Sequence, residues 1–441
     1  MSLLDCRAAP FSIPEQPRFE HQWVVAPQGS GKTQLLQSQI AKDLERVARG
    51  EASIIVIDSQ GRNAGKEKKK DRTLIQNLTE LKIFAEGEAL EDKLIVLQPD
   101  TEHPLALNLF DMGQHNPDLS PRERQILHMS SLKLVSFCLS GTTGQQEDMI
   151  DYLVQLAMAV PDATIDTVRR MLTPKGIEEF RPYFDQVDEV VRDYFLHVFN
   201  TQSQNVTKEA VMRRVMGMLK NPTFRKMYQN RRNKFSMLRE IDAGKVIVIN
   251  TDMELLGREA CELFGRFFIS LLVQATQQRT NSKPVYCYID ECQDYIAADE
   301  NIASLLDKAR KQKVGFILAH QRLSNITSPN VLDALSNVAV KFAGGNITDA
   351  PTLSRYMRAP PEFISNQPRL SFAAFVRGHT PQAIQVSVPY GVMEEMPRMT
   401  EAEQSDLQRS MRERYAVSSS DPSPAKPTEP PDGGPQWDDV V

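Results

Sequence analysis

The sequence has little of several features that would place it in other protein classes. It contains only five cysteines in 441 residues. None of them has CxxC or His-bearing metal spacing, so we expect reduced thiols, mostly in the core, rather than a disulfide scaffold or a zinc site. The five are Cys6, Cys138, Cys261, Cys287 and Cys292.

Long apolar runs and a positive net charge are lacking as well. No stretch approaches the roughly 18–20 apolar residues of a membrane helix, and residues 1–19 are polar and interrupted by proline, without a signal-peptide pattern. The net charge of −5 gives no overall attraction for nucleic acid. Basic runs are local, at residues 66–72, 213–214 and 225–234. Each is either a solvated surface or a phosphate contact, and the sequence leaves both readings open.

The overall composition of the chain fits a large cytosolic enzyme. With 41% hydrophobic and 25% charged residues, the chain can bury a substantial core and is expected to divide into two domains.

Residues 26–33 read APQGSGKT and follow the apolar run His21–Val25. This pattern predicts a phosphate-binding loop between a strand and a helix over about residues 34–46. Two glycines would let successive N–H groups point at one anion, and the helix dipole would point at the same phosphates. Ala26 stands where the full pattern has glycine. The predicted nucleotide-binding residues are Gln28, Gly29, Ser30, Gly31, Lys32, Thr33 and Gln34.

Two of these residues have specific predicted roles. Lys32 would reach the β- and γ-phosphates of ATP, and the Thr33 hydroxyl would ligate Mg²⁺. The alternative interpretation is a chance glycine-rich turn. The strand and the helix predicted on either side of the motif favour the functional reading.

A second motif follows the short β-prone run Val285–Ile289, which ends in Asp290 and Glu291. An apolar strand of this kind is typical of the middle of a sheet that is covered on both faces. Its carboxyl end is the edge where ligands bind in open α/β folds. We predict that Asp290 holds Mg²⁺ and that Glu291 orients or deprotonates the attacking water. A solvated acidic turn is the alternative.

A third strand is predicted at residues 315–319, after a helix at about residues 301–312, and it leads to Gln321. A polar side chain at the tip of a strand beside the acidic one could touch the γ-phosphate and sense its hydrolysis. A simple polar cap of the strand is the alternative.

These motifs, in this order, resemble the HerA–FtsK superfamily of P-loop motor ATPases, and within it the conjugative coupling proteins of the TraG/TraD type and their HerA-like relatives. Residues 54–61 are similar to the family strand that ends in an Asp-x-x-Gly turn. Residues 94–99 and 107–110 are similar to its strand and Asn-Pro-Leu segment, with Leu109 in place of Pro. Residues 288–322 resemble the acidic strand, helix and sensor strand. The likeness covers roughly residues 20–110 and 240–390.

The resemblance implies a ring, a homo-hexamer by analogy, with ATP and Mg²⁺ at subunit interfaces. In such rings an Arg from the neighbouring subunit completes the site and stabilises charge on the transferred phosphoryl group. Arg310 lies in the best-matching segment and is our candidate. The other candidates are Arg279, which ends a predicted helix that could reach a subunit edge, Arg322, Arg355 and Arg358.

The implied cargo is DNA, most simply duplex DNA gripped through its phosphates. A nuclease or relaxase and a membrane secretion complex are possible partners. Typical coupling proteins carry N-terminal membrane helices, which this sequence does not show. We therefore expect a cytoplasmic protein, peripheral at most to a membrane secretion complex.

The predicted fold class is α/β: a P-loop NTPase sheet of the RecA/FtsK type flanked by helices, with an inserted all-α domain and a disordered C-terminal tail. We expect an irregular lead-in at 1–19, the ATPase domain at 20–115 and 241–400, and the helical insertion at 116–240. The helical insertion is predicted from the helical periodicity of its apolar residues and from its spaced prolines. Residues 401–441 are expected to be helical and then disordered, acidic and rich in proline.

Two other functions stay open from the sequence. A motor of the same fold could drive protein secretion, and stimulation of the ATPase by duplex DNA would separate the two. Alternatively, nucleotide binding could only control assembly of a complex. The acidic Glu291 argues against that alternative, because a switch that never hydrolyses ATP does not require it.

Overall fold

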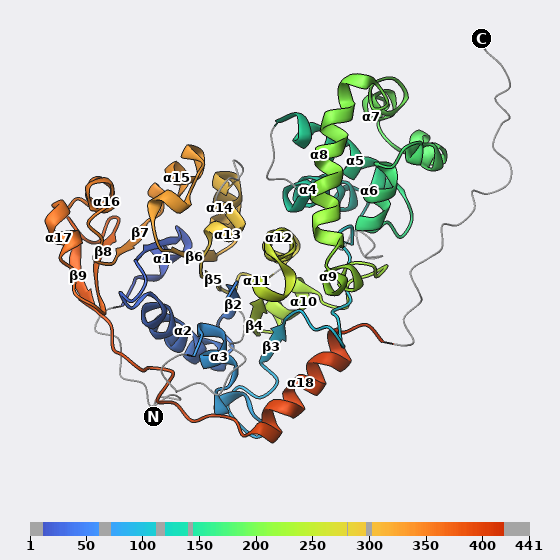
Figure 1. Cartoon of the computed structure of the whole chain (residues 1–441). Helices are drawn as coiled ribbons and strands as arrows, with labels where there is room; N and C mark the ends of the chain where they lie inside the picture. Colours follow the sequence, from blue (N-terminus) through green and yellow to red (C-terminus); the bar gives the residue numbers. More distant parts are fainter. Residues whose placement is uncertain are drawn as a thin grey trace, which may run out of the picture. The chain divides into compact units, whose positions relative to one another are not determined.

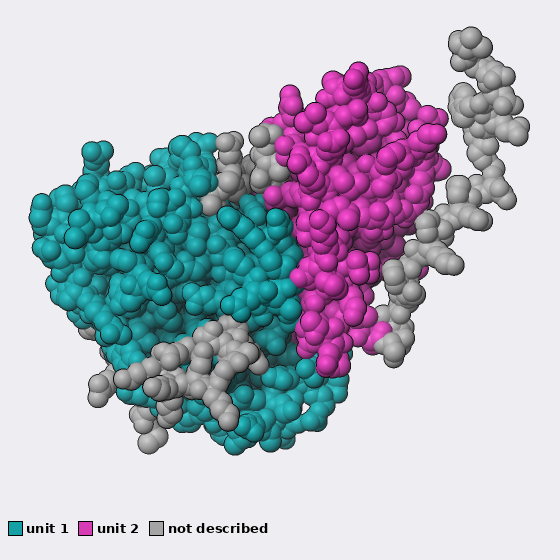
Figure 2. Space-filling model, viewed as in Figure 1, with its two compact units in different colours: residues 1–99, 236–414 teal, residues 100–235, 415–441 magenta. Residues whose placement is uncertain are grey.

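The computed structural model describes residues 12–60, 72–111, 120–139, 144–279, 281–296 and 302–418. The chain forms two compact units, residues 1–99 with 236–414 and residues 100–235 with 415–441 (Figure 2). We call them the sheet unit and the helical unit. The boundaries predicted from the sequence, at 115/116 and 240/241, lie later in the chain than these.

The sheet unit contains nine strands in the order β3-β4-β2-β5-β6-β1-β7-β8-β9 (Figure 1). The first seven in the chain run parallel, whereas β8 pairs antiparallel with β7 and with β9. The strands are β1 (Gln22–Val25), β2 (Ser53–Asp58), β3 (Leu94–Leu97), β4 (Val246–Asn250), β5 (Val285–Ile289), β6 (Val314–His320), β7 (Val340–Ala343), β8 (Ser371–Val376) and β9 (Ile384–Ser387).

Burial explains why these segments are strands. Every residue of β1 to β8 is buried. Strands of a sheet that helices cover on both faces are buried in this way, and their sequences are typically continuous runs rich in Val and Ile, as in these strands. Among the strands only β9, at one edge of the sheet, has exposed residues, with Val386 as its one buried residue. The predicted α/β fold class with a central sheet is therefore confirmed, and most predicted strands agree with the observed ones to within one or two residues.

Helices connect and cover the strands of the sheet unit. Their bounds are α1 (Glu15–Phe19), α2 (Lys32–Ala48), α3 (Leu74–Thr79), α10 (Met237–Asp242), α11 (Met253–Leu256), α12 (Arg258–Gln278), α13 (Gln293–Ile296), α14 (Ile302–Lys311), α15 (Pro329–Ser336), α16 (Ala350–Met357), α17 (Pro361–Ser365) and α18 (Glu401–Tyr415), with 3₁₀ turns η2 (Lys82–Phe84) and η6 (Leu323–Asn325). Helix α2 packs into the main core with Leu36, Ile40 and Leu44.

The helical unit contains no strand among its described residues. Its elements are α4 (Pro121–Leu139), α5 (Gly144–Ala159), α6 (Ile165–Met171), η3 (Gly176–Gln186), α7 (Glu189–Asp193), the π-helical turn η4 (Tyr194–Val198), η5 (Gln202–Gln204), α8 (Asn205–Leu219) and α9 (Pro222–Met227). Apolar faces of α5, α6 and α8 form its interior, with Leu153, Val168 and Val215 buried. Within the described ranges, no helix is both long and apolar enough to cross a membrane.

The C-terminal tail falls mostly outside the described residues. Helix α18 occupies residues 401–415, and residues 419–441 are not described. The predicted disordered tail therefore stays a prediction.

Candidate functional site

The glycine-rich loop joins β1 to α2, as the motif predicts. Gly29 and Gly31 have φ angles of +81° and +105°, the left-handed region that glycine adopts without strain. A side chain at Gly31 would also crowd Leu370, because a Cβ would lie 2.8 Å from its Cδ2 and 3.2 Å from its Cα. Gly31 is the N-cap of α2, so the unpaired N–H groups of the first helical turn begin at this point.

The loop is supported from the sheet side. The Leu370 N–H donates to the Ser30 carbonyl at 2.8 Å, and the Ala26 N–H donates to the His320 carbonyl at 3.1 Å. Ala26 is fully buried, and its methyl group would lie 3.0 Å from a Cβ placed on Gly344. Gly344, at the end of the neighbouring strand β7, therefore leaves the space that Ala26 needs in place of the usual glycine.

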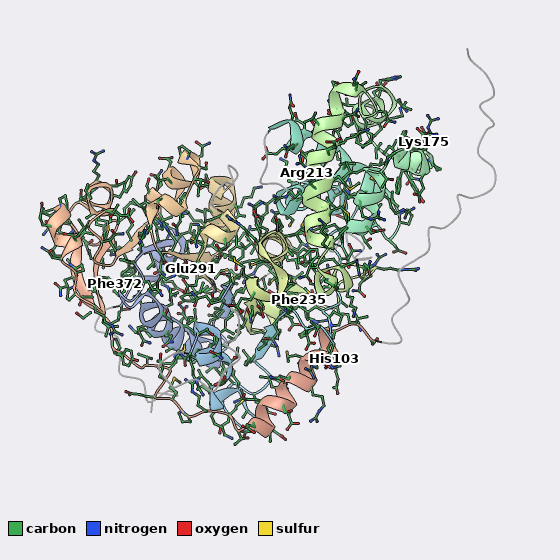
Figure 3. All side chains as sticks on the ribbon, viewed as in Figure 1. His103, Lys175, Arg213, Phe235, Glu291 and Phe372 are labelled. Atoms are coloured by element: carbon green, nitrogen blue, oxygen red, sulfur yellow. The ribbon has the colours of Figure 1, made fainter. Side chains whose placement is uncertain are left out.

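Lys32 contacts both predicted acidic residues. Its ammonium lies 2.7 Å from Oε1 of Glu291 and also donates to Oδ1 of Asp290. All three side chains are buried, at 9% exposure or less. Two segments about 258 residues apart in sequence thus meet at one point, in the sheet unit where Figure 3 labels Glu291.

Burial and charge act in opposite directions on these groups. Burial alone would lower the pKa of Lys32, but the two carboxylates more than offset it and raise that pKa. Burial raises the pKa of Asp290 in spite of Lys32. For Glu291, burial is outweighed by Lys32 and by amide hydrogen bonds, so its pKa is lowered. Glu291 is thus held as a carboxylate.

Glu291 is oriented by its neighbours and by its backbone. Gln321 donates to Oε1 at 2.8 Å, and Gln293 donates to Oε2 at 3.0 Å. The φ angle of Glu291 is +48°, a conformation that costs a non-glycine residue of order 1 kcal/mol or more. Backbone strain of this kind is concentrated at functional sites, because the surrounding structure must enforce it. Gln321, at the tip of β6, is placed beside Glu291 as expected.

Sequence reasoning missed two further carboxylates at this edge. Asp58 ends β2, next to β5, and is 1% exposed. Burial and then the negative charge of Asp290 raise its pKa. Asp294, in α13, accepts a hydrogen bond from the Ser59 hydroxyl at 2.6 Å. The signal for Asp58 was its place at the end of an apolar strand beside the acidic one.

The residues present fit a Mg²⁺-bound nucleotide. Helix α2 presents its first N–H groups beside a loop of two left-handed glycines, which is an anion-binding arrangement. Thr33 is partly exposed at the start of that helix. No group of three or more His, Cys, Asp or Glu side chains suited to a metal occurs within the described ranges. Nucleotide-bound Mg²⁺ needs no such cage, since one or two carboxylates and the phosphates suffice.

The candidate arginines differ in accessibility. The Arg279 side chain is 1% exposed and bonds to Asn281, so it cannot reach a neighbouring subunit, and we drop it from the candidates. Arg322, Arg355 and Arg358 are exposed. Arg310 is half exposed and pairs with Glu20 at 3.0 Å.

The basic runs are only partly described. Most of the run at residues 66–72 lies outside the described residues. In the helical unit, Arg231 and Arg232 pair with Asp162 at 3.5 and 3.0 Å. Lys220, Arg225 and Lys226 are exposed there.

Comparison with known proteins gives a match in structure but not in sequence. No protein-family profile and no curated protein sequence matches the chain. Its structure is similar to that of "Plasmid coupling protein TrwB in complex with the non-hydrolysable GTP analogue GDPNP", with a TM-score of 0.63, 15% identity and coverage of 90% of this chain and 91% of that one. "Plasmid coupling protein TrwB in complex with ADP and Mg2+" matches with a TM-score of 0.62, 15% identity and the same coverage.

The likeness spans both units, and it shows that the chain has the fold of a conjugative coupling protein. The resemblance inferred from the motifs is therefore confirmed at the level of fold.

Proposed function

We propose that this chain is a ring-forming ATPase that uses ATP and Mg²⁺ to move duplex DNA. The observation that carries the proposal is the contact of Lys32 with Asp290 and Glu291, which brings the phosphate-binding loop and the acidic strand end to one place. The two together form the minimal hydrolytic site of a P-loop ATPase.

The geometry suggests how ATP would engage the site. The β- and γ-phosphates would take the Lys32 ammonium away from the two carboxylates. Thr33 and Asp290 would then hold Mg²⁺, which supplies a positive charge that neutralises the phosphates. Glu291, which keeps its hydrogen bonds from Gln293 and Gln321, would orient and deprotonate the attacking water. Gln321 would report the state of the γ-phosphate through the same carboxylate.

The assembly and the cargo rest on the likeness in fold. We infer a homo-hexamer in which Arg310 of one subunit reaches the nucleotide of the next, and a grip on DNA phosphates rather than on bases. A nuclease or relaxase and a membrane secretion complex would be its partners, with the chain itself in the cytoplasm.

The first experiment measures ATPase rate with and without linear duplex DNA, beside the mass in solution from light scattering. We expect a hexamer whose rate rises with DNA. A Lys32→Ala variant should lose ATP binding and turnover, and unchanged nucleotide affinity would contradict the role of the loop. An ATPase that ignores DNA would point to a protein cargo. A chain that binds ATP and never hydrolyses it would point to nucleotide-controlled assembly.

A further inference from the structure

Residues 388–394 form a short segment that we call the strap. Hydrogen bonds connect it at two points to the phosphate-binding loop and to the first turn of α2. At one end the Val388 N–H donates to the Leu370 carbonyl at 2.8 Å, and the Leu370 N–H donates to the Ser30 carbonyl of the loop at 2.8 Å. Further along, the Gly391 N–H donates to Oε1 of Gln34 at 2.8 Å. Gln34 lies two residues after Lys32. Figure 1 traces the path of this segment from β9 to α18.

The far end of the strap is fixed as well. Glu394 accepts hydrogen bonds through one oxygen from Gln34 at 2.7 Å, from Gln37 at 3.3 Å and from Asn77 at 3.2 Å. Gly391 is buried and has a φ of +81°, where a side chain would be strained. The strap therefore has a defined position across the first turns of α2.

Tyr390 lies between these anchors, and about half of it is exposed to solvent. It is 47% exposed and has no ring contact or hydrogen bond to any described residue. An aromatic ring on an otherwise well-anchored segment, next to the loop, is placed to contact something bound there. Leu370, whose side chain packs against Gly31 and whose carbonyl accepts from Val388 two residues before Tyr390, is a partly exposed aliphatic group.

The order of strands sets the direction in which a bound nucleotide must extend. Strand β1 has β6 on one side and β7 on the other, and the acidic strand β5 lies beyond β6. A γ-phosphate bound by Lys32 would therefore face β5 and β6, where Gln321 donates to Glu291. The α-phosphate, sugar and base would extend away from them, past the first turn of α2 and toward β7, β8 and β9. The strap follows β9 and crosses that first turn.

We propose that Tyr390 is the stacking platform for the nucleobase, with Leu370 as an aliphatic contact beside it. This inference rests on the proposed nucleotide-binding function and deepens it. Stacking uses the π-face that every base has, so it tolerates a change of base, and the larger purine rings stack more strongly than pyrimidines. The site would therefore take ATP and GTP with similar affinity and CTP or UTP more weakly.

The test compares the binding of Mg²⁺-ATP with that of Mg²⁺-tripolyphosphate, which has no base, by calorimetry on the full chain. In the wild type we expect ATP to bind more tightly than tripolyphosphate. Tyr390→Ala should weaken ATP binding about tenfold, within the range for loss of one aromatic–base stack, and leave tripolyphosphate binding unchanged. Tyr390→Phe should keep wild-type affinity. Ile384→Ala is the matched control, since Ile384 is 46% exposed on β9 but off the strap.

Each outcome bears on the proposal. Wild-type ATP affinity in Tyr390→Ala would overturn it. An equal loss for ATP and tripolyphosphate would also overturn it, because the strap would then act only by supporting the loop. If the wild type binds neither ligand, the proposed function itself fails and this inference falls with it. If ATP binds and Tyr390 has no effect, only the inference fails.

Discussion

Helix α2 and strand β5 meet at two buried ionic clusters, and the two differ in their balance of charge. At the far cluster, Arg18 makes two hydrogen bonds to Asp43, at 2.6 and 2.7 Å, and Tyr288 of β5 donates to the same carboxylate at 2.6 Å. The Arg18 guanidinium also lies 3.6 Å from the centre of the Tyr286 ring. One cation meets one anion here, and both carboxylate oxygens have partners.

At the near cluster one cation faces an excess of carboxylates. Lys32 bonds to Asp290 and Glu291, while Asp58 is buried beside them. Burial of unbalanced negative charge raises the pKa of Asp58 and of Asp290. A cluster with balanced charge stabilises the packing of a helix on a sheet. A cluster with excess negative charge is suited to bind a further cation. The difference distinguishes a structural ion pair from a site for Mg²⁺ and its nucleotide.

The largest expected effect on the ATPase rate comes from substitution of an arginine in a surface ion pair. Glu20 pairs with Arg310 through one oxygen at 3.0 Å and with Arg377 through the other at 2.6 Å. The two arginines are 48% and 47% exposed, so loss of either pair costs little stability. If Arg310 serves the neighbouring subunit, Arg310→Ala should lower the ATPase rate by about 10³–10⁵-fold. Arg377→Ala should not. Equal rates in the two variants would remove Arg310 from the mechanism.

Glu291→Gln tests the near cluster directly. The amide cannot accept a proton from water, so turnover should fall by about 10²–10⁴-fold, the usual contribution of general-base catalysis. ATP binding should persist, because Lys32 and the loop are intact. Stability at pH 7 should fall somewhat, because the lowered pKa of Glu291 means that its charged form stabilises the fold. Single-turnover hydrolysis and ATP titration measure the two effects. Turnover at the wild-type rate would show that Glu291 is not the base.

Asp43→Ala makes the opposite change at the far cluster. It leaves the Arg18 charge buried without its partner, and such a loss typically costs about 3–5 kcal/mol of folding free energy. ATP affinity of the folded protein should stay the same. Urea unfolding followed by the fluorescence of buried Trp23 reports the stability of the sheet unit. A variant that loses nucleotide affinity but not stability would reverse the assignment of the two clusters.

The sequence predicted the near cluster much better than the far one. The loop, the acidic strand end and Gln321 are local patterns, and parallel strands bring their carboxyl ends to one edge of the sheet. Arg18, Asp43 and Tyr288 carry no comparable pattern. Each is an ordinary residue in its own segment, and only packing of α1, α2 and β5 makes them a cluster.

Arg279 and Tyr390 show the same limit. Position at the end of a helix suggested that Arg279 could reach a subunit edge, but its guanidinium folds back onto Asn281 and the carbonyl of Lys283. In the sequence, Tyr390 is an ordinary aromatic residue within the largely apolar run Val386–Met393. Its position beside the phosphate-binding loop depends on hydrogen bonds from the strap to Gln34 and Leu370, which are distant in sequence. No spacing of residues in the sequence predicts these hydrogen bonds.

The smallest expected effect is on how the free energy of unfolding depends on pH. It follows from the excess of carboxylates in the near cluster. Asp58 has a pKa near 3.9 when unfolded, and folding raises it. An acid of this kind takes up a proton on folding, so its contribution is fully present at low pH and is lost as the pH rises above about 4 toward neutrality. Without nucleotide, Asp58→Asn should therefore be more stable than the wild type at pH 7, by about 1 kcal/mol or more. The gap should close toward pH 4, because wild-type Asp58 is then protonated as well. Urea midpoints across this range measure the gap, and a gap that stays constant with pH would mean that Asp58 carries no unbalanced charge.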